Sequence, residues 1–350
     1  MNKDSQYVLS RRFQSGFAII LNRPEAINSL TEAMIDRIDA LMDEAAADER
    51  CRFVLFYATG SKGFCAGGDI KELARLVSLK HYDKADSFFQ KEYSLDLKIH
   101  LFPKPVIVIA DGITMGGGLG IAAGADIRIA TDRTRMAMPE TRIGFFPDVG
   151  STGWMFTRCP KGYPEYLGLT GYDMQGPECV RLGFATHFIL YDHIPGLLDI
   201  LESVRLEDTQ DRQVTGKVLL EKMSGLLDFH IPDRFPMDAW VKKYFSGKAN
   251  IKDILASLSR CGDQEERCNE VFASIAERSP TALVLTLKLL RYNEGRSIAD
   301  VFATELKAAK YMSRHPDYLE GIRARLVERD NNPHWQPDRI ELVDPSGFLP

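Results

Sequence analysis

Short apolar strands alternate with helices over the first two hundred residues, and this alternation limits the fold more than any other feature. The strands are predicted at residues 16–22, 52–60, 104–112, 127–131 and 185–190. Parallel strands need a long crossover connection, usually a helix, whereas a two-residue turn serves only antiparallel neighbours. Strand, turn and helix in repeated order therefore predict an α/β layer structure.

The helix expected after the first strand carries a start signal. Ser29 and Glu32 match a capping box, in which two side chains satisfy free N–H groups at the beginning of a helix. An apolar stripe at helical spacing follows, made of Met34, Ile35, Ile38, Leu41 and Met42. A similar stripe of Ile70, Leu73 and Leu76 predicts a helix after the second strand.

Strand signals stop near residue 195, and helical patterns take over. Ser279–Pro280 opens a well-patterned helix, and further helices are predicted at 298–312 and 317–329. The tail is rich in proline, which predicts irregular structure. We therefore expect two parts, an α/β core over residues 1–195 and an all-helical region over 196–350.

Composition and charge exclude several classes of protein. The net charge of −5 gives no basic footprint for nucleic acid and no polybasic patch for a membrane. The first residues lack the apolar core of a signal peptide, and no apolar run is long enough to span a bilayer. The six cysteines have neither metal-site spacing nor the density of a small secreted domain. We therefore expect a cytoplasmic protein with reduced cysteines and no metal site.

Two glycine-rich turns carry the strongest chemical signals. They are "FCAGGDI" at residues 64–70 and "ITMGGGLG" at 113–120, and both lie near predicted strand ends. Glycine lets a ligand approach the main chain closely. Two backbone N–H groups aimed at one oxygen form an oxyanion hole, which stabilises the charge that develops on a carbonyl during acyl chemistry. Helix N-termini after both turns would reinforce this effect.

Two acids lie in an otherwise apolar stretch, "MPETRIGFFPDVG" at residues 138–150. Glu140 and Asp148 are costly to bury there unless they are paired, hydrogen-bonded or used in chemistry. The alternative is a structural loop in which Glu140 begins a helix after Pro139 and Asp148 faces solvent. The residues alone leave both interpretations open.

Two other enzyme classes have partial matches. Residues 118–123 fit G-x-G-x-x-A, the outline of a dinucleotide fingerprint, and would indicate an NAD-dependent oxidoreductase. The first glycine of that fingerprint should end a strand, whereas "DGITMG" intervenes here. Ser151 in "VGSTGW" does not fit G-x-S-x-G, which argues against a serine hydrolase.

The order of these motifs resembles the crotonase (enoyl-CoA hydratase/isomerase) superfamily over nearly the whole chain. The resemblance rests on "LNRPEAINSL", "GFCAGGDI", "DGITMGGGLGIAAGADIRIAT", "MPETRIGFFPDVG" and "YLEGIRARLVERDNNPHW". Within the superfamily, "GITMGGG", "MPET" with "FPDVG", and "LTGYDMQGPECVRLGFATHF" resemble the 3-hydroxyisobutyryl-CoA hydrolases. The resemblance implies a spiral of ββα units, with an all-helical C-terminal region closing over an acyl pocket.

The resemblance also implies roles for individual residues. The N–H groups of Gly68 and Gly117 would form the oxyanion hole. Glu140 matches one of the two glutamates that manage water in hydratases, and the other falls at Gly120. The loss of that second acid argues against hydration of an enoyl thioester. Asp148 is an acid at a position where hydratases tend to have glycine, so the pocket has lost one acid and gained another.

Glu140 and Asp148 are therefore the predicted catalytic pair. Glu140 would act as nucleophile or as general base on water, and Asp148 would orient water, share a proton or bind the substrate hydroxyl. Glu92 matches an acid with which the hydrolases contact substrate. The predicted substrate-binding set is Glu92, Gly117, Glu140 and Asp148. Cys65 has no histidine nearby in sequence to activate it and is predicted to pack in the core.

The expected activity is hydrolysis of a small β-hydroxyacyl-CoA thioester, such as 3-hydroxyisobutyryl-CoA in valine breakdown. A hydratase or isomerase of the same fold is the first alternative. A non-catalytic acyl-CoA-binding protein is a more distant one, and the NAD-dependent enzyme is another. Coenzyme A is part of the substrate, so no separate cofactor is expected. The resemblance leaves the oligomeric state open between a trimer-based assembly and a monomer.

Overall fold

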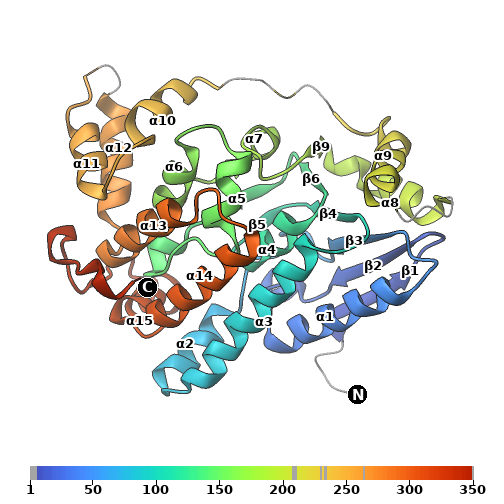
Figure 1. Ribbon diagram of the computed structural model, residues 1–350, viewed down its shortest axis with the longest axis horizontal. Helices are drawn as coiled ribbons and strands as arrows, with labels where there is room; N and C mark the ends of the chain where they lie inside the picture. Colours follow the sequence, from blue (N-terminus) through green and yellow to red (C-terminus); the bar gives the residue numbers. More distant parts are fainter. Residues whose placement is uncertain (1–5, 207–210, 229–230, 232–234, 263–264, 349–350) are drawn as a thin grey trace. The chain divides into compact units, whose positions relative to one another are not determined.

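The computed structural model describes residues 6–206, 211–228, 231, 235–262 and 265–348, and its elements are labelled in Figure 1. Contacts group the chain into two compact units that interleave along the sequence. Unit 1 holds Met1–Gly68, Lys91–Met136 and Met174–Asp233, and unit 2 holds Asp69–Gln90, Ala137–Asp173 and Arg234–Pro350. Strands and helices in layers confirm the predicted α/β class.

The main sheet of unit 1 has six strands in the order β1-β2-β3-β4-β6-β9. β1 pairs with β2 in antiparallel fashion, and the later neighbours pair in parallel. The five predicted strands are all confirmed, and β1 is an addition. The strands are β1 (Val8–Arg12), β2 (Gly16–Leu21), β3 (Phe53–Ala58), β4 (Val106–Ala110), β6 (Ile127–Thr131) and β9 (His187–Ile189).

A second, three-stranded sheet has the order β5-β7-β8. Its strands are β5 (Ile113–Met115), β7 (Arg135–Ala137) and β8 (Met174–Gln175). Sequence patterns predicted none of these strands, because two or three residues are too short to show an apolar alternation. The sheet matters for function, since β5 runs directly into the second glycine-rich turn.

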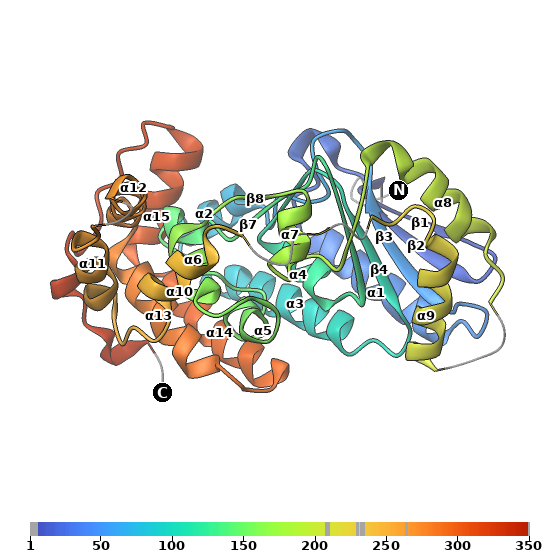
Figure 2. The same ribbon diagram turned by 90° about the horizontal axis from the view of Figure 1, so that it is seen from above.

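The helices of unit 1 cover both faces of the main sheet, as Figure 2 shows. α1 (Glu32–Ala47) contacts β1 and β2, and α4 (Gly117–Gly124) contacts β4. Strands β2, β3, β4 and β6 are buried almost completely. A parallel sheet with both faces covered has this nearly continuous apolar pattern.

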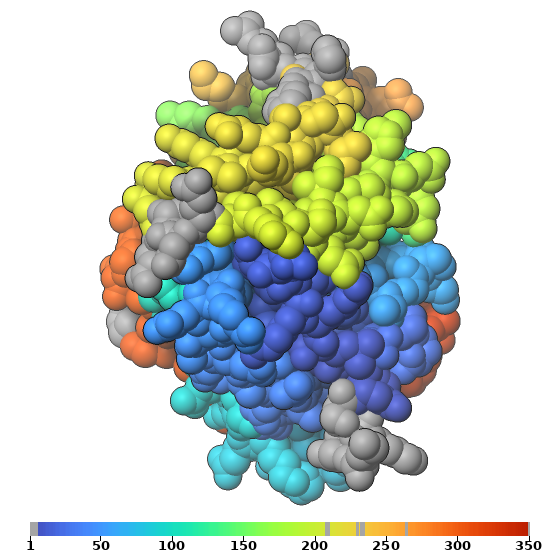
Figure 3. All heavy atoms as spheres, turned by 90° about the vertical axis from the view of Figure 1, so that its right-hand side faces the viewer, coloured from blue at the N-terminus to red at the C-terminus, as the bar shows by residue number. Residues whose placement is uncertain are grey.

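Helices α8 (Ile194–Ser203) and α9 (Arg212–Met223) also belong to unit 1. Their buried Leu197, Leu201 and Leu219 pack into one cluster with sheet residues that include Ile20 and Phe53. Figure 3 shows the atoms of these helices beside those of the N-terminal strands. The first part of the predicted all-helical region is therefore bound to the strands, while a domain boundary at residue 195 stays a prediction.

The start of α1 differs from the prediction. The helix begins at Glu32, and its N-cap is Thr31, whose hydroxyl accepts a hydrogen bond from the Met34 N–H at 3.2 Å. Ser29 is engaged elsewhere, because its carbonyl and its hydroxyl oxygen each accept from the Arg23 guanidinium at 3.0 Å. The predicted capping box is therefore wrong, and Glu32 occupies the first helical position.

Unit 2 is helical, and it confirms the C-terminal prediction. Ser279 caps α13 and Ser297 caps α14, each by accepting a hydrogen bond from an N–H in the first turn. The last predicted helix, at 317–329, ends early, and its second half is a π-helical turn over Arg323–Val327. The helices of the unit are α2 (Ile70–Ser78), α5 (Ser151–Arg158), α6 (Tyr163–Thr170), α10 (Asp238–Phe245), α11 (Ile251–Ser259), α12 (Glu265–Ala276), α13 (Pro280–Asn293), α14 (Ile298–Met312) and α15 (Pro316–Ile322).

One pair of cysteines corrects the expectation of fully reduced thiols. Cys261 and Cys268 form a disulfide, with their Cα atoms 6.3 Å apart. Cys261 lies just after the end of α11 and Cys268 lies near the start of α12, and the two helices pack on each other. A helical hairpin brings residues seven apart to the same end, and the sequence spacing alone could not show that approach.

Candidate functional site

The structure distributes the predicted site residues over both units. Gly68, Gly117 and Glu92 belong to unit 1, and Glu140 and Asp148 belong to unit 2. Each group is described within its own unit.

In unit 1, the two glycine-rich turns lie side by side because the loop before Gly68 pairs with β5. The Cys65 N–H donates to the Ile113 carbonyl at 3.1 Å, and the Met115 N–H donates back to the Cys65 carbonyl at 3.0 Å. A Cβ atom at Gly67 would lie 3.4 Å from the backbone nitrogen of Gly117. The predicted oxyanion pair, Gly68 and Gly117, is thus carried by two adjoining backbone segments.

The second turn requires glycine for its backbone shape. Gly116 has φ 48° and ψ −126°, a conformation that side chains do not tolerate. It places Gly117 at the first position of α4. The first N–H groups of a helix have no acceptor within that helix, so they point toward an incoming oxygen and carry the positive end of the helix dipole.

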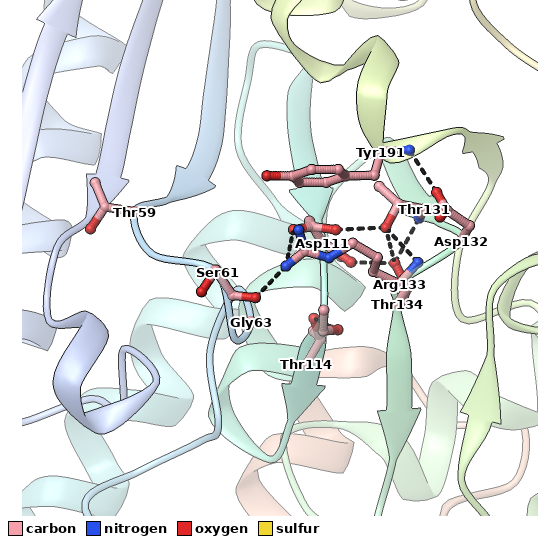
Figure 4. A network of polar contacts seen from close by, with 12 residues as sticks. Thr59, Ser61, Gly63, Asp111, Thr114, Thr131, Asp132, Arg133, Thr134 and Tyr191 are labelled. Carbon is pink, nitrogen blue, oxygen red and sulfur yellow. Dashed lines mark hydrogen bonds and ion pairs between the residues drawn. The ribbon is translucent and has the colours of Figure 1, made fainter.

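A polar network holds the loop that leads to Gly68 (Figure 4). The Asn28 amide donates to the Gly63 carbonyl at 3.1 Å, and the Arg133 guanidinium donates to the Ser61 carbonyl. Arg133 also pairs with Asp111 at 3.5 Å and stacks on the Tyr191 ring, 3.9 Å from its centre. The loop is therefore anchored at several backbone atoms, which a precise pair of N–H groups requires.

Glu92 lies against the second turn, on the part of α3 (Tyr82–His100) that belongs to unit 1. Its side chain is buried, and a Cβ atom at Gly117 would come within 2.2 Å of its Oε1. One helical turn further on, Asp96 is also buried, and a Cβ at Gly120 would come within 2.3 Å of its Oδ2. Two carboxylates thus occupy the space that side chains at positions 117 and 120 would need.

Asp96 is a residue that sequence reasoning missed. The available signal was an acid four residues after Glu92, which places both on one face of a helix. The glycines at 117 and 120 make room for that face. The Asp96 carboxylate of α3 therefore lies beside Gly120, where a side chain at position 120 would begin.

The dinucleotide fingerprint does not have the geometry of a phosphate-binding turn. Residues 118–123 lie within α4 and not at a strand-to-helix junction. A Cβ at Gly118 would meet the Cys65 carbonyl oxygen at 2.4 Å, so this glycine serves close packing. The alternative of an NAD-dependent enzyme based on this motif is wrong.

Cys65 packs in the core, in line with its prediction. Its thiol is fully buried and donates to the Asn28 carbonyl at 3.2 Å. Burial, with smaller contributions from the charges of Glu92 and Asp96, raises the pKa of this thiol to about 12. A thiol that stays protonated at neutral pH is a poor nucleophile.

In unit 2, Glu140 begins a short 3₁₀-helix, Glu140–Ile143, directly after Pro139. Glu140 therefore begins a helix, as the structural alternative expected, and it does so as a buried acid that is 8% exposed. Helix α15 packs on this segment, and a Cβ at Gly144 would lie 2.1 Å from the Asp317 carbonyl oxygen. Gly144 has φ +69°, so both its shape and its surroundings require glycine.

Aromatic rings complete the surroundings of the Glu140 segment. Phe145 stacks on Phe146 at 4.6 Å and on Phe89 at 5.6 Å between ring centres, and Tyr318 packs at 5.5 Å. These side chains are buried. The two phenylalanines of "GFFPD" are thus core residues that fix the chain between Glu140 and Asp148.

Asp148 is 7% exposed, which contradicts the alternative of a solvated turn acid. It precedes two residues with positive φ, Val149 at +51° and Gly150 at +79°. Its backbone carbonyl accepts a hydrogen bond from the Ser151 N–H at 2.9 Å, at the start of α5. A tight, left-handed turn therefore places this acid before the helix.

Glu305, on α14, is a second buried acid that sequence reasoning missed. It is fully buried and accepts hydrogen bonds from the Gly150 N–H at 2.6 Å and from the Thr152 N–H at 3.1 Å. The pKa of Glu305 is raised to about 8, mainly by burial; the hydrogen bonds from Thr152 and Gly150 lower it, and the nearby charge of Asp148 adds to the rise. The sequence signal was a glutamate on the apolar stripe of a predicted helix.

The residues that the structure describes contain neither a metal-ligand cluster nor a helix that could span a membrane. In this part of the chain, no three His, Cys, Asp or Glu side chains gather closely enough to hold a metal ion. Among the described helices, none is long and apolar enough to cross a membrane.

Comparison with known proteins gives consistent matches along the chain. The family model for enoyl-CoA hydratase/isomerase matches residues 17–348. A mitochondrial 3-hydroxyisobutyryl-CoA hydrolase of Gallus gallus is 34% identical, over 94% of this chain and 84% of its own length. The protein of the same name from Homo sapiens is 31% identical, over 93% of this chain and 83% of its own.

Two solved structures share the fold over nearly their full length. A carnitinyl-CoA dehydratase from Mycobacterium thermoresistibile aligns with a TM-score of 0.86 at 31% identity, covering 99% of this chain and 97% of its own. An enoyl-CoA hydratase from Rhodobacter sphaeroides 2.4.1 aligns with a TM-score of 0.82 at 29% identity, covering 98% and 96%. The match over residues 17–348, together with these relatives, shows that the chain belongs to the enoyl-CoA hydratase/isomerase family, the crotonase superfamily.

Proposed function

We propose that the protein hydrolyses a small β-hydroxyacyl-CoA thioester, with 3-hydroxyisobutyryl-CoA as the first candidate. The observation that carries the proposal is the exchange of acids: glycine stands at position 120, while Glu140 and Asp148 are both buried in one apolar segment. The names of the vertebrate relatives support the same substrate. With that substrate, the products would be 3-hydroxyisobutyrate and free coenzyme A, as in valine catabolism.

The reaction needs a polarised carbonyl, an attacking oxygen and a proton for the leaving thiolate. The N–H groups of Gly68 and Gly117 would bind the thioester oxygen and stabilise the negative charge that develops on it. Glu140 would attack the carbonyl carbon itself, or would take a proton from the attacking water. The C–S bond then breaks, and the thiolate of coenzyme A takes a proton. Where Glu140 itself attacks, the acyl–Glu140 anhydride is then cleaved by water, which releases the free acid and regenerates the carboxylate.

Asp148 and Glu92 would complete the substrate site. Asp148 would carry the proton or bind the β-hydroxyl. Glu92, which lies against Gly117, would contact the acyl part of the substrate. No cofactor is required, because coenzyme A arrives with the substrate.

A free-thiol assay tests the proposal directly. The protein should release coenzyme A from 3-hydroxyisobutyryl-CoA and should remove the enoyl absorbance of crotonyl-CoA slowly or not at all. Loss of enoyl absorbance without thiol release would reject the hydrolase and favour a hydratase.

Hydration or dehydration is the second candidate, and Asp96 is the observation that favours it. Its carboxylate lies where a side chain at position 120 would begin, so it could supply the second hydratase acid. Asp96→Asn separates the two functions. In a hydrolase that relies on Glu140 and Asp148, thiol release should fall less than about tenfold, whereas a hydratase should lose at least ~10² of its rate with a catalytic acid.

The cellular compartment and the assembly belong to the proposal as well. We keep the cytoplasm as the expected compartment, although the vertebrate relatives are named as mitochondrial proteins. Cell fractionation with an antibody against the protein tests this. Sedimentation of the purified protein decides between a monomer and a trimer-based assembly.

A further inference from the structure

The turn that carries Asp148 has a backbone conformation that needs outside support. Val149 has φ +51°, which is a rare conformation for a β-branched residue, and Gly150 follows with φ +79°. Such residues persist only where the surrounding structure fixes them. Glycine at 150 relieves one of the two positions, but Val149 remains strained and fully buried.

The Glu305 carboxylate supplies that support from α14. One of its oxygens accepts the Gly150 N–H at 2.6 Å. The other accepts the Thr152 N–H at 3.1 Å and the Thr152 hydroxyl at 2.5 Å. Gly150 has no side chain with which to cap α5, so this glutamate from a distant part of the sequence serves as the cap.

Two further contacts fix the same turn. The Asn293 amide, at the end of α13, donates to the Thr152 hydroxyl oxygen at 2.8 Å, which directs the hydroxyl proton toward Glu305. The Trp154 indole N–H donates to the Val149 carbonyl at 3.2 Å. Helices α5, α13 and α14 pack on one another (Figure 1), and a Cβ at Gly153 would lie 2.5 Å from Val301 on α14.

We propose that Glu305 is a positioning residue for Asp148, holding the turn over residues 148–152 in its strained conformation through hydrogen bonds to Gly150 and Thr152. The proposal rests on the proposed function in one respect, namely that Asp148 takes part in the reaction. Rotation of the turn about Val149 would carry the Asp148 carboxylate with it. A catalytic acid moved by about 1 Å can cost ~10² in rate.

The first test measures the hydrogen bonding of the turn directly and does not depend on enzyme activity. Glu305→Gln replaces one acceptor oxygen by an N–H₂ group, so either Gly150 or Thr152 loses its acceptor. Hydrogen–deuterium exchange of a peptide covering residues 149–153 should become at least ~10-fold faster, the effect of losing one buried hydrogen bond. Glu165→Gln is the matched control, because Glu165 is also buried in unit 2 but pairs with Arg291.

The second test separates positioning from binding in steady-state thiol release. Glu305→Gln should lower kcat ~10- to ~100-fold. KM should change less than kcat, because the acyl-CoA contacts other than that of Asp148 remain. Thr152→Val removes the hydroxyl at nearly constant shape and should also lower kcat. Thr152→Ser keeps the hydroxyl, so its kcat should be close to that of the wild type. This pair tests the proposal even if Glu305→Gln does not fold.

The proposal is overturned if Glu305→Gln and Thr152→Val exchange at residues 149–153 as slowly as the wild type. It is also overturned if Glu165→Gln lowers kcat as much as Glu305→Gln, since the effect would then follow stability alone. A wild-type protein that releases no thiol from any acyl-CoA rejects the proposed function instead, and the exchange experiment still decides whether Glu305 holds the turn.

Discussion

The two halves of the predicted chemistry are built in different ways. In unit 1, backbone atoms make the site: glycines at 67, 116 and 117 let two loops adjoin and turn into a helix. In unit 2, buried side chains make it: Glu140 and Asp148 are held by a helix packed behind each of them, α15 and α14. A site made of backbone should fail when shape is changed, and a site made of carboxylates should fail when charge is removed.

A substitution in the glycine-rich turns of unit 1 should cause the largest loss of activity. Gly117→Pro removes the N–H that we propose to bind the thioester oxygen, and it forces a ring into the space beside Glu92. Thiol release should fall by at least ~10²–10³, the cost of one oxyanion donor. The measurement is kcat of a variant with the circular dichroism spectrum of the wild type. Turnover that survives in such a variant would contradict the oxyanion assignment.

Glu140 and Asp148 can be tested by substitutions that remove the charge of the side chain and keep its shape nearly constant. Glu140→Gln and Asp148→Asn should each lower the rate of thiol release, the first by at least ~10². The double variant should be about as slow as the worse single variant, because residues that act in one step do not contribute additively. Steady-state kinetics of all three variants provide the check. If the two losses multiply in the double variant, the two acids serve separate steps. If both single variants keep rates near that of the wild type, the segment over residues 138–150 has only a structural role.

The packing of α15 on the Glu140 segment can be tested by measuring the free energy of unfolding. Gly144 and Gly295 both have positive φ, at +69° and +75°, but only Gly144 faces a neighbouring backbone at 2.1 Å, whereas Gly295 faces open space. Gly295→Ala should cost about 1 kcal/mol in free energy of unfolding, from backbone strain alone. Gly144→Ala should cost roughly 1–3 kcal/mol more, because α15 must move. Urea unfolding of both variants compares them, and equal losses would mean that α15 yields easily.

The last prediction concerns how the free energy of unfolding depends on pH through Glu305, the residue that supports the Asp148 turn. The pKa of Glu305 is raised in the folded protein from 4.5 to about 8, so the folded state holds its proton more tightly than the unfolded state. The stabilisation is complete below about pH 4.5, and it is lost as pH rises from there to about 8. Glu305→Gln should flatten this slope between pH 5 and 8 in urea unfolding. A slope identical to that of the wild type would show that Glu305 is ionised throughout this range.

The layer structure and the two glycine-rich turns could be predicted from the amino-acid sequence alone. Strands β2, β3, β4 and β6 are continuous apolar runs, and a chain can bury such runs only in a covered sheet. The glycines at 116 and 117 and the acids at 140 and 148 were evident because each is unusual in its local surroundings. Local composition carries that information, so no knowledge of distant contacts was needed.

The distant residues that support the glycine-rich turns and the two acids could be identified only from the folded structure. Asp96 and Glu305 lie on ordinary amphipathic helices, and nothing in their neighbours along the chain shows which element each will face. Asp96 fills the space left at Gly120, and Glu305 caps a helix that begins more than one hundred residues earlier. The same holds for Cys261 and Cys268, which a helical hairpin brings together. Packing of whole helices sets these contacts, because burial rewards a good fit between surfaces and is independent of sequence separation.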